Sequence, residues 1–461
     1  MQRLARLVLV VGAGTFLFLP GCSDDDSGLD VSEDAPDARD VEETGDAADA
    51  DADAVADGDI AEDGSGVCEQ EFWVWDLSVV PPDDVQICAS AHGEGEHAHV
   101  WVEDEQWGPS VDAAGIEQIL LRWDRETPAG SVAPDQGIFE ILTGIFGDPP
   151  DEFDGDAKIH ILLCAMADSG DAGFDGYFRS TDMTDGRTSN RREMIHINST
   201  GGRPVASPYM IGVMAHELHH MLQWRYDPEE EIWLSESFAE LAMVLTGYPT
   251  DIGRANAWAR NPTPPLLVSG VGESVDYGAA FLFGAYLHDR LSAEGVAGLV
   301  ADPAHGTASV QTAAERVDPD TTFVELFAEF AMAVLLDDES IGDGRYGFPE
   351  LDLADAGTTA VTFPAAAVTV EVPAGGVELV HVALDGSPHA VLGVDVSAGA
   401  ALELGARVAL IDDVAGTQVF AAAPGTHLAL HDVPATATAI AVALATDEAL
   451  PVGVALTVAD E

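Results

Sequence analysis

Residues 216–220 read His-Glu-Leu-His-His, and residues 233–240 read Trp-Leu-Ser-Glu-Ser-Phe-Ala-Glu. Apolar residues around the first segment recur at helical spacing, which predicts a helix from Tyr209 to Trp224. The second segment lies within another predicted helix, Ile232 to Thr246. Two consecutive helices rich in His and Glu therefore form the centre of a predicted helical region, at about residues 205–345.

The spacing of His216 and His220 is that of a metal-binding pair. An α-helix has about 3.6 residues per turn, so side chains four residues apart share one face, where two imidazoles bind one zinc ion. Glu217 lies about 100° around the helix from His216, which favours contact with a water molecule on the metal over contact with the metal. The sequence therefore predicts His216 and His220 as zinc ligands and Glu217 as a general base, with His219 packing beside them.

A catalytic zinc ion also needs a third protein ligand and one position left for water. A downstream histidine is not the third ligand, because Gln223 and Tyr226 stand where one would be expected. Glu236 on the next helix is the candidate, and Glu240 on the same face is expected to hydrogen-bond to a ligand imidazole. The alternative is that Glu236 and Glu240 are two ordinary solvated carboxylates.

These two segments resemble the zinc-binding region of the gluzincin metallopeptidases, the thermolysin-like clan, and more narrowly the hyicolysin-type secreted bacterial peptidases. In that clan the Glu of an Asn-Glu-Gly-like segment is the third zinc ligand. It corresponds to Glu236, although Ser235 and Ser237 stand where Asn and Gly are common. The resemblance spans about residues 70–345 and implies an α+β peptidase domain with a mixed β-sheet and a helical active-site half. Shorter similar segments lie at 147–151, 154–156, 176–178, 189–190 and 277–280.

The resemblance implies metal-assisted hydrolysis of a protein or peptide substrate by a monomeric enzyme. Zinc lowers the pKa of its bound water to about 7, and Glu217 takes the proton as that water attacks the peptide carbonyl. Related peptidases stabilise the oxyanion with a Tyr or a His. Tyr277 is the candidate here, with an ordinary buried aromatic as the alternative, and His288 on the same predicted helix, Ala279 to Leu291, is a weaker candidate.

Two other functions stay open at this point. The first is a non-enzymatic surface binding protein with a structural or degenerate zinc site. The second is a zinc hydrolase that cleaves another bond, such as an ester or a cell-wall amide. Glu217 disfavours the binding protein, because a purely structural zinc site needs no base.

The charge balance excludes other classes of function. Of 461 residues, 18 are Lys or Arg and 82 are Asp or Glu, so the formal net charge is −64 at pH 7. Nucleic-acid binding needs a basic surface that neutralises phosphates, and adsorption to anionic lipid needs one too. The hydrophobic fraction of 47% is large enough for substantial cores, so the chain is expected to fold into two or three domains.

The N-terminus reads as an export signal. The basic residues Arg3 and Arg6 precede an apolar run that is too short to span a bilayer. Residues 19–22 then read Leu-Pro-Gly-Cys, which resembles a bacterial lipobox with an unusual Pro. We therefore predict a lipoprotein signal peptide at residues 1–21 and a lipidated Cys22 as the only membrane contact. The protein is then expected in the cell envelope, at the outer membrane or cell surface; the alternative is an ordinary secretory signal and a secreted protein.

The rest of the chain divides by composition. Residues 22–66 are acidic and lack aromatics, which predicts a disordered tether, and calcium binding there is the weaker alternative. Residues 67–350 are assigned to the zinc peptidase domain, and residues 351–461, with short β-prone runs and regular turns, to a C-terminal all-β sandwich-like domain. Cys68 and Cys88 are the candidate disulfide, and Cys164 is expected to be buried.

Two further groups of side chains are weaker candidates for metal binding. Three histidines lie in a His- and Glu-rich segment, and three aspartates resemble a calcium loop without the spacing of an EF-hand. A solvated loop and a polar turn are the favoured interpretations. The residues are His92, His97 and His99, and Asp151, Asp154 and Asp156.

Overall fold

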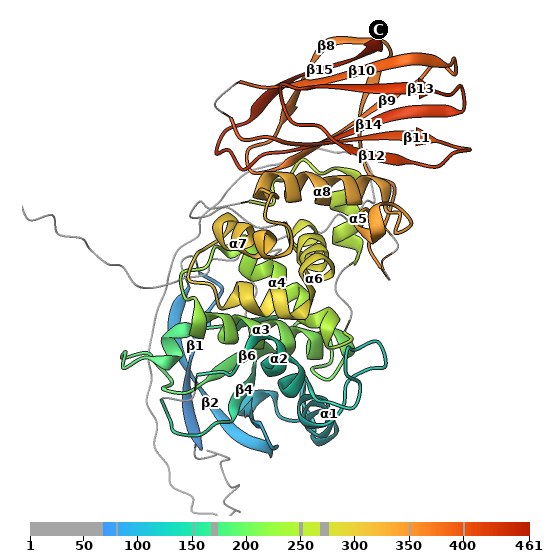
Figure 1. Cartoon of the computed structure of the whole chain (residues 1–461). Coiled ribbons are helices and arrows are strands. Elements are labelled where there is room, and N and C mark those ends of the chain that lie inside the picture. Colours follow the sequence, from blue (N-terminus) through green and yellow to red (C-terminus); the bar gives the residue numbers. More distant parts are fainter. Residues whose placement is uncertain are drawn as a thin grey trace, which may run out of the picture.

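The structure is a computed structural model (Figure 1). It describes residues 68–79, 82–150, 153–166, 174–248, 252–267, 276–349, 351, 353–399 and 402–461. The predicted signal peptide, the lipidation site at Cys22 and the acidic segment up to residue 66 lie outside the described residues. None of the helices in these ranges has the length and the apolar surface that a membrane span requires.

The N-terminal part of the described chain contains a six-stranded mixed sheet. Its strand order is β1-β2-β3-β4-β6-β5. The pairs β3–β4 and β4–β6 are parallel, and the other pairs are antiparallel. The strands are β1 (Gln70–Asp76), β2 (Asp83–Glu94), β3 (Ala98–Glu103), β4 (Ile159–Cys164), β5 (Gly176–Phe178) and β6 (Met194–Asn198). Every residue of β4 and β6 is buried, as expected for parallel strands covered on both faces.

Helices cover one face of this sheet. Val100, Ile161 and Ile197 belong to one large hydrophobic core together with residues of the neighbouring helices, whereas Leu162 and Tyr177 face a smaller cluster on the opposite side. The helices that follow the first three strands are α1 (Ala113–Asp124) and α2 (Ile138–Phe146). The predicted disulfide between Cys68 and Cys88 is confirmed, and it joins the start of the described chain to β2.

A helical region follows the sheet and ends before the last strands. Its helices are α3 (Pro208–Tyr226), α4 (Ile232–Leu245), α5 (Ile252–Arg260), α6 (Tyr277–Val300), α7 (Thr307–Val317) and α8 (Phe323–Leu336). The sequence predicts α3, α4 and α8 closely, the last as a helix from Thr322 to Leu336, but it leaves out α5 and α7. It also ends α6 too early, at Leu291, because the chain kinks at Ser292 (φ 63°) and then continues as helix.

The C-terminal strands form two sheets around a second hydrophobic core. One sheet has the order β13-β10-β15-β8 and the other β12-β11-β14-β9-β7. The strands are β7 (Thr359–Thr362), β8 (Ala365–Val372), β9 (Val377–Ala383), β10 (His389–Ser397), β11 (Gly405–Asp412), β12 (Gln418–Ala421), β13 (His427–Val433), β14 (Ala437–Ala445) and β15 (Val452–Asp460). The predicted α+β class and β-rich C-terminal region are therefore confirmed.

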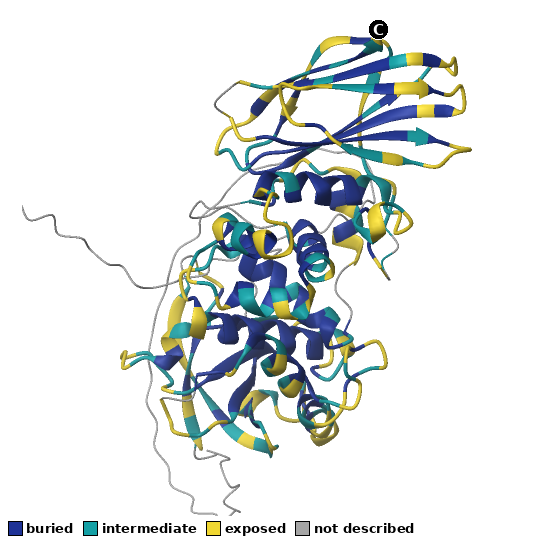
Figure 2. Cartoon of the chain, in the orientation of Figure 1, coloured by how far each residue is buried: buried dark blue, intermediate teal, exposed yellow. Residues whose placement is uncertain are grey.

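The helical region and the C-terminal strands share buried surface. Helix α8 lies against β9, β11 and β14 (Figure 1), and Ala409, Ala441 and Ala443 belong to the same core as the helices. Buried residues run without a break from the helices into these strands (Figure 2). Glu329 of α8 also accepts a hydrogen bond from Arg407 of β11 at 3.1 Å. The predicted boundary thus falls between α8 and β7, and the described parts on either side of it share a hydrophobic core.

Candidate metal centre

Helix α3 carries His216, Glu217 and His220, and its position is set on all sides. The helix begins at a Ser207 cap followed by Pro208, both typical of a helix start. It packs against α2, α4 and strands β5 and β6, so its middle is buried around its whole circumference. The three side chains are therefore held by packing against several elements rather than by α3 alone.

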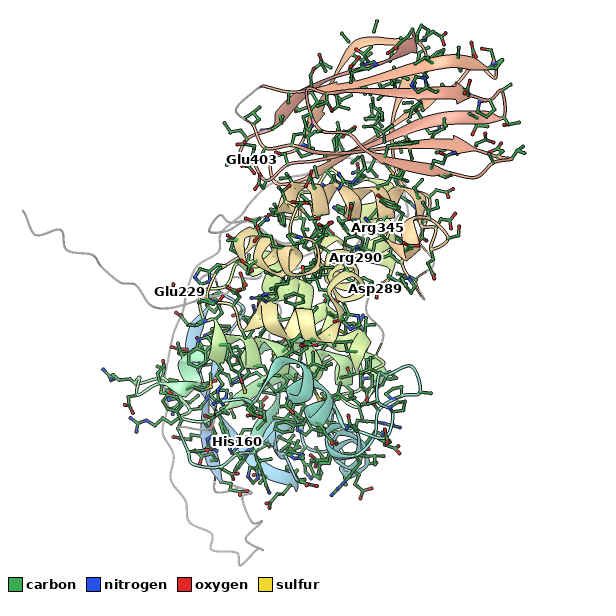
Figure 3. The ribbon with its side chains drawn as sticks, viewed as in Figure 1. His160, Glu229, Asp289, Arg290, Arg345 and Glu403 are labelled. Carbon is green, nitrogen blue, oxygen red and sulfur yellow. A yellow bond between two sulfur atoms is a disulfide. The ribbon has the colours of Figure 1, made fainter. Side chains whose placement is uncertain are left out.

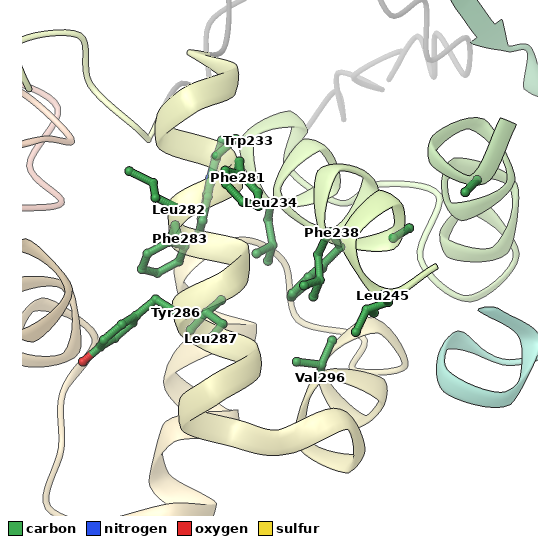
Figure 4. Close-up of a cluster of buried hydrophobic side chains, with 14 of the residues drawn as sticks. Trp233, Leu234, Phe238, Leu245, Phe281, Leu282, Phe283, Tyr286, Leu287 and Val296 are labelled. Carbon is green, nitrogen blue, oxygen red and sulfur yellow. The ribbon is translucent and has the colours of Figure 1, made fainter. Parts of the chain in front are cut away.

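Helix α4 carries Glu236 and is fixed mainly by α6. Figure 4 shows the apolar side chains of these two helices packed against each other, with the Trp233 and Phe283 ring centroids 5.8 Å apart. A β-carbon on Gly284 would lie 2.2 Å from the carbonyl oxygen of Ser237, so only glycine allows α6 to approach α4 this closely. This close packing sets the distance between α4 and the helices around it.

The structure brings the three predicted ligands together. The Nε2 atoms of His216 and His220 are 3.1 Å apart, and Glu236 oxygens lie 3.3 Å and 3.7 Å from these two nitrogens. Ligand atoms bound tetrahedrally to one zinc ion are separated by about 3.3–3.5 Å, given bonds of about 2.0–2.2 Å. The donor atoms of the three residues therefore have about the spacing of ligands around a single zinc ion.

The environment of Glu236 also fits a bound cation. This residue has no exposed surface, and neither carboxylate oxygen has a hydrogen-bond partner among the described residues. A buried ionised carboxylate without partners is strongly destabilising, so such groups are paired or bind metals. The two nearest polar atoms are imidazole nitrogens, which complete a nitrogen and oxygen donor set suited to zinc.

Both histidines have a polar contact on the ring nitrogen that faces away from this centre. His220 Nδ1 lies 3.0 Å from Ser235 Oγ, and His216 Nδ1 lies 3.6 Å from a carboxylate oxygen of Glu240. Burial lowers the pKa of His216 to about 3 and that of His220 to about 4. Both rings are therefore neutral at pH 7, which is the form that binds metal.

Glu217 lies beside the three donors but is separate from them. It is buried, it accepts a hydrogen bond from the backbone N–H of Phe178, and its Oε2 has no partner among the described residues. Burial, and then the nearby carboxylate of Glu236, raise the pKa of Glu217 well above its usual range. A carboxylate with a raised pKa is suited to take up and return a proton near neutral pH.

Tyr277 lies close to the same carboxylates, at the first residue of α6. It is half-buried, and the Arg254 guanidinium lies 5.4 Å from its ring centroid. Burial, and then the carboxylates of Glu236, Glu240 and Glu217, raise the pKa of Tyr277 well above its usual range. The phenol is thus protonated at neutral pH, and it is a hydrogen-bond donor.

His288, the weaker predicted alternative, lies elsewhere. It is eleven residues beyond Tyr277 on the same helix, which corresponds to about 16 Å along the axis. Its Nδ1 lies 3.7 Å from Asp289, and Figure 3 labels Asp289 on the part of α6 that faces outward. This position excludes His288 from the group around Glu236.

The other predicted metal groups do not assemble in the described residues. His219 points into the core, where its Nε2 lies 3.0 Å from Gln223 Oε1, so it packs beside the site as predicted. The three N-terminal histidines have separate neighbours: His92 stacks on Trp107, His97 pairs with Asp124 and His99 pairs with Asp156. The side chain of Asp154 pairs with His160 and that of Asp156 with His99, and Asp151 lies outside the described residues.

Sequence reasoning missed a second group of possible metal ligands, Asp227, Glu230 and His305. An acidic segment directly after α3 contains the two carboxylates, but the imidazole of His305 lies two residues before α7. Nothing in the spacing of these residues indicates that they meet. The contact of Ser235 with His220 is likewise invisible in the sequence, where a serine early in a helix is more often a cap.

No protein-family model matches the chain, and no curated protein matches it. Two solved structures are similar over part of the chain. The Yersinia pseudotuberculosis-derived mitogen is 11% identical and covers 21% of this chain and 85% of its own, with a TM-score of 0.18. The pre-peptidase C-terminal domain of collagenase from Bacillus anthracis is 7% identical and covers 23% and 99%, with a TM-score of 0.17. Both TM-scores are too low to bear on fold or function.

Proposed function

We propose that the chain is a zinc metallopeptidase of gluzincin type. The observation that carries this proposal is Glu236, a fully buried carboxylate with no hydrogen-bond partner among the described residues, which faces the Nε2 atoms of two neutral imidazoles. Taken without Glu217, these three residues would fit a structural zinc site equally well. The unpartnered Oε2 of Glu217 beside it favours a catalytic site, because a base has no role in structural metal binding.

His216, His220 and Glu236 would hold the ion, which when bound supplies Lewis acidity and a water pKa of about 7. Glu217 Oε2 accepts the proton of the water that attacks the peptide carbonyl, and it then returns that proton to the leaving amine. The phenol of Tyr277 donates a hydrogen bond to the carbonyl oxygen as negative charge develops there. Ser235 and Glu240 orient the two imidazoles through their Nδ1 atoms.

The remaining parts of the proposal concern cellular context. The export signal and Cys22 place the enzyme in the bacterial cell envelope as a lipid-anchored monomer, with the acidic segment as a spacer and the C-terminal strands as an accessory β-sandwich. Its substrate would be a protein or peptide. With its strong negative charge, the chain is not expected to bind nucleic acid.

The test is a Glu217→Gln variant of the zinc-loaded protein, assayed on a broad peptide library with and without a chelator. General-base catalysis contributes about 100- to 10,000-fold, so cleavage should fall by that factor while one equivalent of zinc stays bound at His216 and His220. Glu117→Gln, at an exposed position of α1, is the matched control and should cleave at the wild-type rate.

Two results would redirect the proposal. A wild-type protein that binds zinc at this centre but cleaves no peptide would favour the binding protein. Cleavage of ester or cell-wall amide substrates, without any cleavage of peptides, would favour the other zinc hydrolase.

A further inference from the structure

A second group of donor side chains lies where the connection between α3 and α4 meets the segment just before α7. The segment between α3 and α4 contributes Asp227 and Glu230, and His305 stands two residues before α7. His305 Nδ1 is 2.8 Å from Asp227 Oδ2. Glu230 Oε1 accepts hydrogen bonds from the backbone N–H groups of Gly306 at 2.7 Å and Glu231 at 2.6 Å. These contacts hold the three side chains around one point.

The three residues offer ligand atoms that all lie within 4.8 Å of one another. The Asp227 side chain is 4% exposed and that of His305 is 38% exposed, so the group is closed on one side and open to water on the other. Among the described residues, no Lys or Arg pairs with Asp227 or Glu230. The imidazole of His305 pairs with Asp227, and the further negative charge of Glu229 lies 4.0 Å from its Nε2 at the exposed edge (Figure 3).

We propose that Asp227, Glu230 and His305 bind a second divalent cation of the zinc class. One imidazole and two carboxylates form a mixed nitrogen and oxygen set, which suits zinc better than calcium, because calcium takes six to eight oxygen ligands. A carboxylate has about four lone-pair positions, so the backbone hydrogen bonds of Glu230 leave it free to bind metal.

The position of this site indicates a structural role. Residues 227–231 connect α3 to α4, the two helices that carry the donors of the first centre. A cation bound here would fasten this connection to the start of α7. The carboxylate of Glu229 beside this group is exposed to solvent, unlike the buried Glu217 beside the first centre. The site does not depend on peptidase activity, because it would bind metal whether or not the first centre is catalytic.

The experiment counts zinc in the full chain. The protein is stripped with a chelator, dialysed against zinc and analysed for zinc per chain. The wild type should bind two equivalents, His305→Ala one, and Asp227→Asn one. His97→Ala is the matched control, because His97 pairs with Asp124 at 3.1 Å. The side chains of His97 and Asp124 are 32% and 4% exposed, close to the 38% and 4% of His305 and Asp227. It should still bind two equivalents.

A second measurement separates the two centres. In a His220→Ala background, added zinc should still raise the melting temperature, and His305→Ala in that background should abolish the increase. If His220→Ala does not fold, a cobalt titration of the wild type replaces it and should show two spectrally distinct equivalents, of which His305→Ala removes one.

The outcomes are distinct. A wild type with one equivalent, lost in His220→Ala but kept in His305→Ala and Asp227→Asn, overturns this inference and leaves the proposed function intact. One equivalent that only His305→Ala and Asp227→Asn remove supports this inference and contradicts the proposed zinc centre. Calcium binding that is unchanged by His305→Ala and excludes zinc would also overturn it.

Discussion

The two groups of donors combine the same side-chain chemistry in different surroundings. In the first, His216, His220 and Glu236 are all buried, and Glu236 makes no hydrogen bond within the described residues. In the second, Glu230 and His305 are partly exposed, and the carboxylates already accept backbone and imidazole hydrogen bonds. A buried metal ligand without a hydrogen-bond partner destabilises the fold unless a cation binds it. Ligands that already accept hydrogen bonds, as in the second group, carry a smaller penalty without a cation.

The surroundings also separate chemistry from structure. Glu217 and Tyr277 lie beside the first group. Burial raises the pKa values of both, and the carboxylate of Glu236 raises them further. We therefore expect substitutions around the first group to change zinc affinity and turnover. Substitutions in the second group should change zinc content and stability while leaving the chemical step unaffected.

The largest effect is expected for Glu236→Gln. The amide keeps the size of the side chain but removes the charge that faces the two imidazoles. Residues that only support a ligand contribute about 10- to 100-fold to metal affinity, so loss of this ligand should weaken zinc binding by more than about 100-fold. Competition with a chelator measures this. Glu230→Gln should leave the affinity of the tighter zinc equivalent unchanged; equal losses in both variants would end the distinction between the groups.

Tyr277→Phe is expected to lower kcat by about 100-fold, because one hydrogen-bond donor to a developing oxyanion is worth about 100- to 1,000-fold. KM and zinc content should change little. Tyr286→Phe, on the same helix, is the control: its hydroxyl is buried, has no partner among the described residues and lies in the aromatic core. A Tyr277→Phe enzyme with wild-type kcat would assign Tyr277 to packing alone.

Ser235→Ala should weaken zinc binding by about 10-fold, at the low end of what such supporting contacts contribute. The variant removes the oxygen 3.0 Å from His220 Nδ1. Ser237→Ala is a closely matched control, because Ser237 lies on the same helix but donates its hydrogen bond to the backbone carbonyl of Trp233 at 2.7 Å. Equal zinc affinity in the two variants would show that Ser235 does not orient the imidazole.

The first group could be predicted from sequence because helical periodicity determines it. Residues 216 and 220 face the same way on any helix, and the next amphipathic helix has few acidic side chains that can reach them. Helices α3 and α4 follow in the same way from their apolar periodicity. The second group could not be predicted, because His305 is 78 residues from Asp227 and their meeting depends on how α7 packs.

Other misses have similar causes. Helices α5 and α7 are short, and they contain few apolar residues because only one face of each is buried. The edge strands β7 and β12 have only four residues each and lie beside turns. The sequence also shows no sign that α8 is buried against β11 and β14, because the alanines of that interface read as a neutral stretch of strand.

The smallest expected effect is a pH dependence of the metal-free protein. Burial raises the pKa of Glu217, so above the usual carboxyl pKa the folded state binds a proton that the unfolded state releases, and the free energy of unfolding falls as pH rises toward the folded pKa. His216 and His220 have the opposite sign, and their contribution is complete about one pH unit above the usual histidine pKa of about 6.5, where histidines of the unfolded chain are neutral.

Above about pH 7.5 the two histidines no longer oppose the slope due to Glu217, which is at most about 1.4 kcal/mol per pH unit. Glu217→Gln should flatten it in urea titrations at several pH values. Glu230→Gln should not, because the pKa of Glu230 is raised only to about 7 and its contribution ends there. Both variants share the chain's other carboxylates, so the difference between their slopes compares Glu217 with Glu230. Parallel slopes would mean that Glu217 is ionised in the folded metal-free protein and that burial does not raise its pKa.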